Sequence, residues 1–292
     1  MIAAGEKDPA AFVIYEVKNM RKKWFVRAML LAVIVLAAVG LDPRMIMRTY
    51  TVETDKLDAP VRLAVVADFH GCNYGKDAAR LVQAVVELQP DAVLLPGDIF
   101  DDNLPWDDSA ALVRSLGQRW PCYYVSGNHE CWTNQQDSIH QILTEAGVTV
   151  LNRSCAVLEV NGQQLNLCGI PDPYANAETE RNLTRAAAGA IPGAYTILLA
   201  HRPELIDQYA ANGAFDLVVA GHAHGGQVRI PFLVNGLYAP NQGWFPKYAG
   251  GRYEVDGTTM IVSRGLARES TLFPRVFNRP ELVLIELRPS AR

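Results

Sequence analysis

The sequence predicts an α/β fold whose globular part begins near Val61 and is preceded by an apolar helix. Hydrophobic residues make up 49% of the 292 residues, which is enough for one sizeable core. From Val61 onward, short β-branched runs alternate with helical patterns, as in strand–helix–strand units that build a largely parallel sheet. Strand patterns return in the last third of the chain and predict a second, mostly antiparallel sheet.

The first element is an apolar run from residue 28 to residue 41, which follows the basic residues Arg21, Lys22, Lys23 and Arg27. The run is shorter than the ~20 residues that span a bilayer, so a signal anchor and a cleaved signal peptide are both open. We favour the uncleaved anchor. Five Lys or Arg residues lie within 15 residues before the run and three after it, a weak bias toward an inside N-terminus. We therefore expect association with the inner (plasma) membrane, with the side of the globular domain left open.

This organisation divides the chain into four parts. We expect residues 1–19 to be an N-terminal extension without an assigned role, 20–45 the apolar segment, 46–60 a linker and 61–292 one globular domain. Met20 is an alternative start of the natural protein.

Three successive strand and helix pairs follow. The apolar runs predict strands at 61–67, 91–97 and 121–127, and the periodic segments after them predict helices near 77–89, 107–118 and 135–146. Asn161-Gly162 lies between two further strand patterns and predicts a two-residue hairpin turn. A polar helix is expected around 175–188, and the next strands at 194–200 and 215–221. Short strands are expected in the segments GQVRIP, GRYEVDG, TTMIVSRG and ELVLIEL.

Charge and cysteine content narrow the class of protein. A formal net charge of -4 gives no global basic field, so nucleic acid is not an expected partner. The five cysteines are widely spread and contain no C-x-x-C pair, so neither a disulfide framework nor a zinc ribbon is implied. They suit reduced, buried thiols, and the compartment stays open.

Metal-ligand side chains gather at the predicted strand ends. Five of the six histidines lie in or beside turns that follow strands, namely His70, His129, His201, His222 and His224. Asp68, Asp98 and Asn128 occupy similar positions. The carboxyl ends of parallel strands converge on one rim, so these distant residues can meet there. Singly each suits an ordinary turn, but together the oxygen and imidazole groups indicate a site for manganese, iron or zinc. His140, on a predicted helix, receives no role.

These residues resemble the motif set of the calcineurin-like metallophosphoesterases over roughly Val61 to Leu287. The matching segments, in order, are Asp68-Phe69-His70, Gly97-Asp98-Ile99-Phe100-Asp101, Gly127-Asn128-His129-Glu130, His201 and Gly221-His222-Ala223-His224. The resemblance implies a two-sheet α/β/β/α sandwich of the metallo-dependent phosphatase type, so that residues 61–292 form a metallophosphoesterase catalytic domain. The family usually has threonine where Ala223 stands, a departure that leaves every ligand intact.

The resemblance also implies roles. Asp68, His70 and His224 would hold one divalent ion, Asn128, His201 and His222 the second, and Asp98 would bridge both. Manganese is the expected metal, with iron or zinc as alternatives. A water shared by ions ~3.5–4 Å apart would attack the phosphorus. His129, oriented by Asp101, would protonate the leaving group, which is typically worth ~10²–10⁴-fold in rate.

The substrate is less constrained. Arg202, Arg264, Arg275 and Arg279 are candidates to hold a second phosphate or a head group, because guanidinium groups match phosphate oxygens. The segments GHAHGGQVRIP and FNRPELVLIEL resemble the membrane-associated branch of the family, which includes exported phosphodiesterases and UDP-2,3-diacylglucosamine pyrophosphatases of lipid A biosynthesis. A globular domain on the cytoplasmic side of the inner membrane would favour the lipid-linked substrate. A domain on the outer side would favour a periplasmic phosphodiester. A membrane-tethered scaffold without turnover is the alternative from another class.

Overall fold

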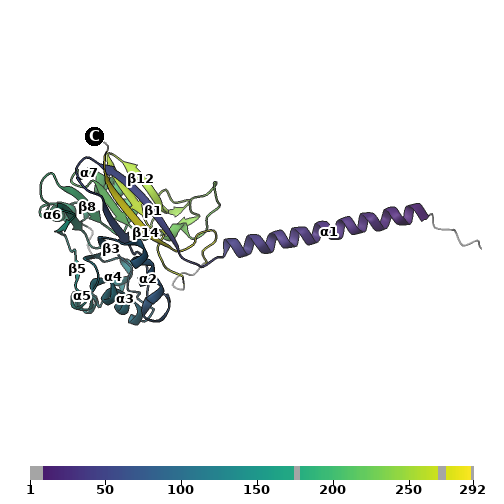
Figure 1. Cartoon of the computed structure of the whole chain (residues 1–292), viewed down its shortest axis with the longest axis horizontal. Coiled ribbons are helices and arrows are strands. Elements are labelled where there is room, and N and C mark those ends of the chain that lie inside the picture. The colour runs from purple at the N-terminus through teal and green to yellow at the C-terminus, as the bar shows by residue number, and fades with distance from the viewer. Residues whose placement is uncertain (1–8, 174–177, 269–273, 291–292) are drawn as a thin grey trace, which may run out of the picture. The chain divides into compact units, whose positions relative to one another are not determined.

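The structure is a computed structural model that describes residues 9–173, 178–268 and 274–290. The chain divides into two compact units, Met1–Asp42 and Pro43–Arg292. In the first, residues Pro9–Gly40 form one long helix, α1 (Figure 1). Its segment Lys18–Gly40, 23 residues, is long and apolar enough to cross a membrane by length and composition. The helix includes part of the extension that the sequence left unassigned.

The first sheet of the second unit has the strand order β1-β14-β2-β3-β4-β5. Strands β2 to β5 are mutually parallel, and β14 runs antiparallel to β2. The bounds are β1 Ile46–Thr54, β2 Val61–Val65, β3 Ala92–Pro96, β4 Cys122–Val125, β5 Val148–Val150 and β14 Glu281–Pro289. The predicted helices appear as α2 Ala79–Leu88, α3 Asp107–Gly117 and α5 Gln136–Glu145, with the short elements η1 Lys76–Ala78 and α4 Asn128–Trp132 beside them.

The second sheet has the order β12-β13-β9-β8-β7-β6. Its bounds are β6 Ser154–Val160, β7 Gln163–Gly169, β8 Tyr195–Leu199, β9 Leu217–Ala220, β12 Gly251–Val255 and β13 Thr258–Val262. The remaining elements are α6 Thr179–Ala187, α7 Ile206–Ala211, η2 Pro203–Leu205, η3 His224–Gly226, and the two-residue strands β10 Tyr238–Ala239 and β11 Gly243–Trp244. The Asn161-Gly162 turn joins the antiparallel strands β6 and β7, as the sequence predicts.

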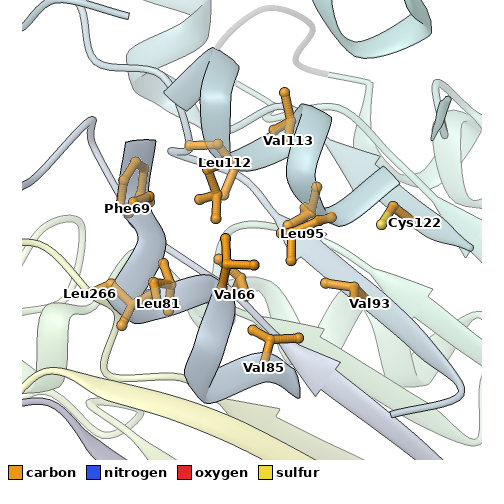
Figure 2. Close-up of a cluster of buried hydrophobic side chains, with 14 of the residues drawn as sticks. Val66, Phe69, Leu81, Val85, Val93, Leu95, Leu112, Val113, Cys122 and Leu266 are labelled. Atoms are coloured by element: carbon orange, nitrogen blue, oxygen red, sulfur yellow. The ribbon is translucent and has the colours of Figure 1, made fainter. Parts of the chain in front are cut away.

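Alternating side chains of each sheet create the layers of the domain. Val66, Val93 and Leu95 of the first sheet region pack against Leu112 and Val113 of α3 and their neighbours on α2 (Figure 2). Residues that alternate with these along the strands face the other side of the sheet, for example Leu63, Val65 and Leu94. They form a second buried cluster with Leu165, Leu167, Ile197 and Leu199 of the other sheet. A third cluster covers the far face of the second sheet with α6 and α7. This order of helices, two sheets and helices confirms the predicted α/β/β/α sandwich.

Three expectations about the strands need correction. Residues 46–54, expected as part of a linker, form β1, which pairs in parallel with β14 along nine residues. The second sheet is mixed and not mostly antiparallel, because β7, β8, β9 and β13 run parallel and only its edge pairs are antiparallel. The GQVRIP segment makes only isolated bridges, and the ELVLIEL segment belongs to the first sheet as β14.

The cysteines also differ from the expectation of reduced thiols. Cys155 and Cys168 face each other across the β6–β7 pair and form a disulfide. Cys72, Cys122 and Cys131 are buried thiols outside the disulfide, as expected. The pairing escaped the sequence analysis because it depends on strand register, which places two residues 13 positions apart directly opposite each other.

Candidate metal centre

The predicted ligands stand directly beyond the carboxyl ends of parallel strands in both sheets. Asp68, Asp98 and Asn128 follow β2, β3 and β4, and His201 and His222 follow β8 and β9. The first sheet therefore supplies mostly oxygen ligands, whereas the second supplies imidazoles. All five side chains are buried, at most 3% exposed. The packing of one sheet on the other thus brings the two sets to one rim.

The backbone at this rim is locally strained. Positive φ angles occur at Asp68, His70, Asp98, His222 and His224, with values between 46° and 66°. Residues other than glycine rarely adopt this left-handed conformation, and it persists only where the surrounding structure enforces it. Such strain at five candidate ligands is typical of a functional site.

Four of the residues form a first cluster. Asp68, His70, Asp98 and His224 each offer a ligand atom, and these atoms lie within 4.8 Å of one another. The Nε2 atom of His70 is 3.6 Å from Oδ2 of Asp98, and Nε2 of His224 is 3.8 Å from Oδ1 of Asp68. These separations are too long for hydrogen bonds and leave room for an ion at the centre.

A second cluster shares Asp98 with the first. Asp98, His201 and His222 also have ligand atoms within 4.8 Å of one another. Nε2 of His201 lies 3.0 Å from Oδ2 of Asp98, 3.2 Å from Oδ1 of Asn128 and 3.2 Å from Nδ1 of His222. Asp98 therefore belongs to both clusters.

Hydrogen bonds on the outer side of the rings fix how three histidines face the clusters. Nδ1 of His70 is 2.7 Å from Oδ2 of Asp101, and Nδ1 of His201 is 2.9 Å from the carbonyl oxygen of Pro96. Nε2 of His222 is 2.9 Å from Oδ1 of Asn241. A ring nitrogen that donates to such an acceptor leaves the other nitrogen with its lone pair directed into the cluster, as a metal ligand requires. Asn241 was not foreseen, because nothing near it in sequence marks it as a partner of the site.

Unpartnered buried atoms show that the residues fit cations. Among the described residues, Oδ2 of Asp68, Nε2 of His70 and Nδ1 of His224 are buried without a hydrogen-bond partner. Buried polar atoms normally have partners, because an unsatisfied one costs about 1–3 kcal/mol. Divalent cations at this position would compensate the charge of both carboxylates. The mixed nitrogen and oxygen ligands fit divalent metals.

Protons and cations compete for these groups. Burial lowers the pKa of His201, but the adjacent Asp98 carboxylate outweighs it and raises this pKa to about 10. Burial and the neighbouring His201 lower the pKa of His222 to about 3. Burial opposes ionisation of Asp98, yet His201 and His70 hold its pKa well below the ordinary value. The carboxylate is thus ionised and available, and a cation bound there must displace the proton of His201.

His129 lies at the solvent-facing side of the clusters with two carboxylates. Its Nδ1 is 2.6 Å from Oδ1 of Asp102 and 3.4 Å from Oδ2 of Asp101. The sequence analysis named Asp101 as the residue that orients His129, but the shorter contact of Asp101 is to His70. Oδ1 of Asp101 accepts hydrogen bonds from the backbone N–H groups of Asn103 and Leu104, which turn the carboxylate inward. Asp102 was missed, although its position next to Asp101 was a usable signal.

Glu130 connects the two loops that carry Asp98 and Asn128. Its Oε1 accepts the backbone N–H groups of Ile99 and Phe100, and its Oε2 accepts those of Asp98 and Gly127. Burial, together with the Asp98 carboxylate, raises the pKa of Glu130 to about 7, and the backbone donors oppose this. Because each carboxylate oxygen of Glu130 accepts two hydrogen bonds from backbone N–H groups, the geometry favours the ionised form of this side chain. Glu130 stands within a motif, but its sequence position alone does not reveal this role.

The four arginines predicted to contact substrate bond to the chain itself. Arg202 makes two contacts with Asp172, at 2.7 and 3.1 Å, and Arg264 pairs with Glu281 at 2.6 Å. Arg275 donates to the carbonyl oxygen of Ala267 and Arg279 to that of Arg44. These contacts hold the loops around the rim, so a role in binding substrate stays a prediction.

The Glu130 network predicts that Glu130→Gln destabilises both loops. The glutamine amide group would face two backbone N–H donors and leave them unsatisfied, at ~1–3 kcal/mol each. We expect a loss of roughly 2–6 kcal/mol in the free energy of unfolding, measured by denaturant titration, and a lower metal content after dialysis. Glu145→Gln, on the exposed end of α5, is the control and should change neither quantity. Unchanged stability and metal content in Glu130→Gln would contradict this role.

Comparison with known proteins agrees with the geometry. The family model "Calcineurin-like phosphoesterase" matches residues 61–226. An uncharacterized metallophosphoesterase of Helicobacter pylori is 32% identical over 217 residues, which cover 72% of this chain and 55% of that protein. Phosphodiesterase YaeI of Escherichia coli is 29% identical over 243 residues, 78% of this chain and 83% of the relative. This chain therefore spans little more than half the length of the first relative.

Solved structures agree on the fold. NAD nucleotidase of Haemophilus influenzae superimposes with a TM-score of 0.53 at 14% sequence identity, over 72% of this chain and 46% of the other. At this identity the likeness shows a common fold alone. The family match, however, covers more than half of the sequence and ends at the η3 turn that carries His224. The chain belongs to the calcineurin-like phosphoesterase family, a family of metal-dependent phosphoester hydrolases.

Proposed function

We propose that this chain is a membrane-anchored phosphodiesterase that uses two divalent cations. The observation that carries the proposal is the place of Asp98, whose carboxylate belongs to both ligand clusters. Asp68, His70 and His224 would hold one cation with Asp98, and Asn128, His201 and His222 would hold the other. When bound, the two cations would neutralise phosphoryl oxygens and supply a nucleophile from water near neutral pH. Manganese is the metal we expect, with iron and zinc as alternatives.

His129 is the residue we assign to the leaving group. Its side chain is 21% exposed, so it can meet a substrate at the open side of the clusters. Burial lowers its pKa, but Asp101, Asp98 and Asp102 outweigh burial and raise it to about 9. The raised pKa favours the protonated ring, which can donate its proton to a departing oxygen. Asp102 holds the ring by its Nδ1 atom, which leaves Nε2 to act as the donor.

An open groove beside His129 gives room for the leaving group. The groove has a volume of about 560 Å³ and is lined by Asp101, Asp102, Asn103, Leu104, Pro105, Trp106, Trp132, Thr133 and Gln135. The ring of Trp132 lies 4.6 Å from that of His129, centroid to centroid. A leaving group in this groove would thus contact an aromatic face next to the proton donor.

Two observations support a domain on the outer side of the membrane. The basic residues before the apolar segment favour an inside N-terminus, which places the residues after one crossing outside. The Cys155–Cys168 disulfide fits this side, because disulfides persist in oxidising compartments. A phosphodiester available outside the inner membrane is therefore our first candidate substrate. UDP-2,3-diacylglucosamine, a cytoplasmic lipid-linked substrate, is the second candidate and rests on the sequence resemblance.

The proposed role of His129 predicts that His129→Ala slows turnover and spares the metals. We expect kcat to fall by ~10²–10⁴-fold, because the leaving oxygen loses its proton donor. Metal content, measured by elemental analysis of the purified protein, should stay the same, since His129 is outside both ligand clusters of Asp98. His140→Ala, which changes a histidine on α5, should leave kcat unchanged. A fully active His129→Ala protein would contradict the mechanism.

The carboxylates around His129 predict an alkaline limit of activity. Because the protonated imidazole is the active form, kcat/KM should fall as pH rises through the raised pKa of His129. Asp102→Asn removes one carboxylate that raises this pKa, so the alkaline limb should move to lower pH. Asp55→Asn, at an exposed turn, serves as the matched control. If the alkaline limb of the pH profile lies at the same pH in Asp102→Asn and in the parent protein, the pairing of Asp102 with His129 is excluded.

The substrate assignment is tested with the metal-reconstituted full chain. We expect release of p-nitrophenol from bis-p-nitrophenyl phosphate and no release of UMP from UDP-2,3-diacylglucosamine. Asp98→Asn should abolish the first reaction and reduce the content of both metals, because it removes the shared ligand. UMP release comparable with p-nitrophenol release would favour the second substrate. A chain that binds metals but hydrolyses neither compound would favour a scaffold without turnover.

A further inference from the structure

Six of the ten exposed large hydrophobic residues in the described part of the second unit lie between residues 230 and 245, in a loop that follows η3. The side chains of this apolar loop are Ile230, Phe232, Leu233, Tyr238, Trp244 and Phe245. Phe232 is 107% exposed, Leu233 83%, Trp244 68% and Phe245 67%. Single exposed apolar residues are common, but a cluster of this kind usually marks a surface that another molecule or a membrane covers.

Backbone contacts hold the apolar loop in a defined conformation. The N–H of Arg229 donates to the carbonyl of Val276, that of Val234 to Ile230, and that of Phe245 to Leu237. The rings of Tyr238 and Trp244 lie across the short β10–β11 pair, 5.5 Å apart. Phe232 and Phe245 have φ angles of 69° and 56°, which are costly for bulky residues. The fold therefore keeps large apolar side chains in the solvent, with no gain from burial within the domain.

The charge around the apolar loop is also unusual. The chain has 31 acidic residues, yet residues 217–253 contain none. The cations Arg229 and Lys247 lie in the same segment, whereas Arg252 pairs with Glu254 at 2.8 Å. Carboxylates are repelled by anionic lipids and resist transfer to the membrane interface, whereas tryptophan, tyrosine, lysine and arginine are favoured there. The composition of this segment fits a bilayer surface.

The apolar loop shares its base with the place where the chain enters the domain. The carbonyl oxygen of Val276 accepts a hydrogen bond from the backbone N–H of Arg229. Three residues after Val276, the side chain of Arg279 donates to the carbonyl oxygen of Arg44, at 2.7 Å. Only the five residues 41–45 separate the end of α1 from the start of β1. Five residues reach at most ~18 Å. If α1 is embedded in a membrane, this corner of the domain stays near the bilayer.

We propose that the apolar loop docks into the interfacial region of the lipid bilayer in which α1 is anchored. The inference rests on the proposed membrane anchoring and adds a second contact with the same bilayer. Asn241, on the apolar loop, bonds Nε2 of His222. Docking therefore brings the metal centre to the bilayer surface and favours phosphoesters presented there, such as lipid head groups. A soluble phosphodiester can still reach the site from the water.

The test uses the full chain in lipid nanodiscs made of equal parts phosphatidylcholine and phosphatidylglycerol. Leu233→Cys is labelled with an environment-sensitive fluorophore, since the native thiols are buried or disulfide-bonded. We expect blue-shifted emission and strong quenching by lipids that carry a nitroxide near the head group. The same label at Gln141→Cys, exposed on α5, should show neither effect. A Phe232→Ser, Trp244→Ser background should weaken the quenching at position 233, because it removes two membrane contacts.

Each failure has a different signature. Protein that does not float with lipid vesicles after removal of detergent lacks the proposed anchor, and docking falls with it. Protein that floats and hydrolyses bis-p-nitrophenyl phosphate, but shows no quenching at position 233, retains the proposed function and overturns docking. Blue-shifted emission without quenching by lipid nitroxides, together with a dimer in chemical cross-linking, would assign the apolar loop to contact with a second copy of this chain and also overturn docking.

Discussion

The structure depends on the burial of two carboxylates, Asp68 and Asp98, at the rim where the two sheets meet. Ionised carboxylates are unfavourable inside a protein unless opposite charge is close. Here the compensation comes from imidazoles and from the cations that the site fits. The arrangement of loops around the rim follows from this requirement, because each loop must deliver a ligand atom to a small buried volume. The chemistry and the stability of the rim are therefore linked.

The loops are held from behind as well as from the metal side. Glu130 gathers four backbone N–H groups from the two loops that carry Asp98 and Asn128. Asp101, Pro96 and Asn241 fix the ring orientation of His70, His201 and His222. These contacts offset the unfavourable backbone angles of the ligand residues. A preorganised set of ligands results, which needs little rearrangement when cations bind.

Much of this architecture could be predicted from local sequence patterns. The β2, β3 and β4 runs are continuous and apolar because both faces of those strands are buried, and the Asn161-Gly162 turn fixes a hairpin. The sequence of the edge strand β1 resembles a linker because most of its side chains are polar or exposed, and only its pairing with β14 reveals it. Asp102 and Asn241 acquire their places through tertiary contacts, as does the disulfide. Position within a motif, in contrast, was sufficient to gather all seven ligand candidates.

The edge strand β1 also has a mechanical consequence. It is the first strand after α1, and it pairs with β14 from Ile46 through Thr54. A pull along the strand axis must shear the whole ladder of backbone hydrogen bonds together, whereas a loop at this position would stretch freely. If α1 is anchored in a membrane, as we propose, a force on the anchor would reach the sheet through this ladder. The domain would then move with α1 and stay folded at the junction.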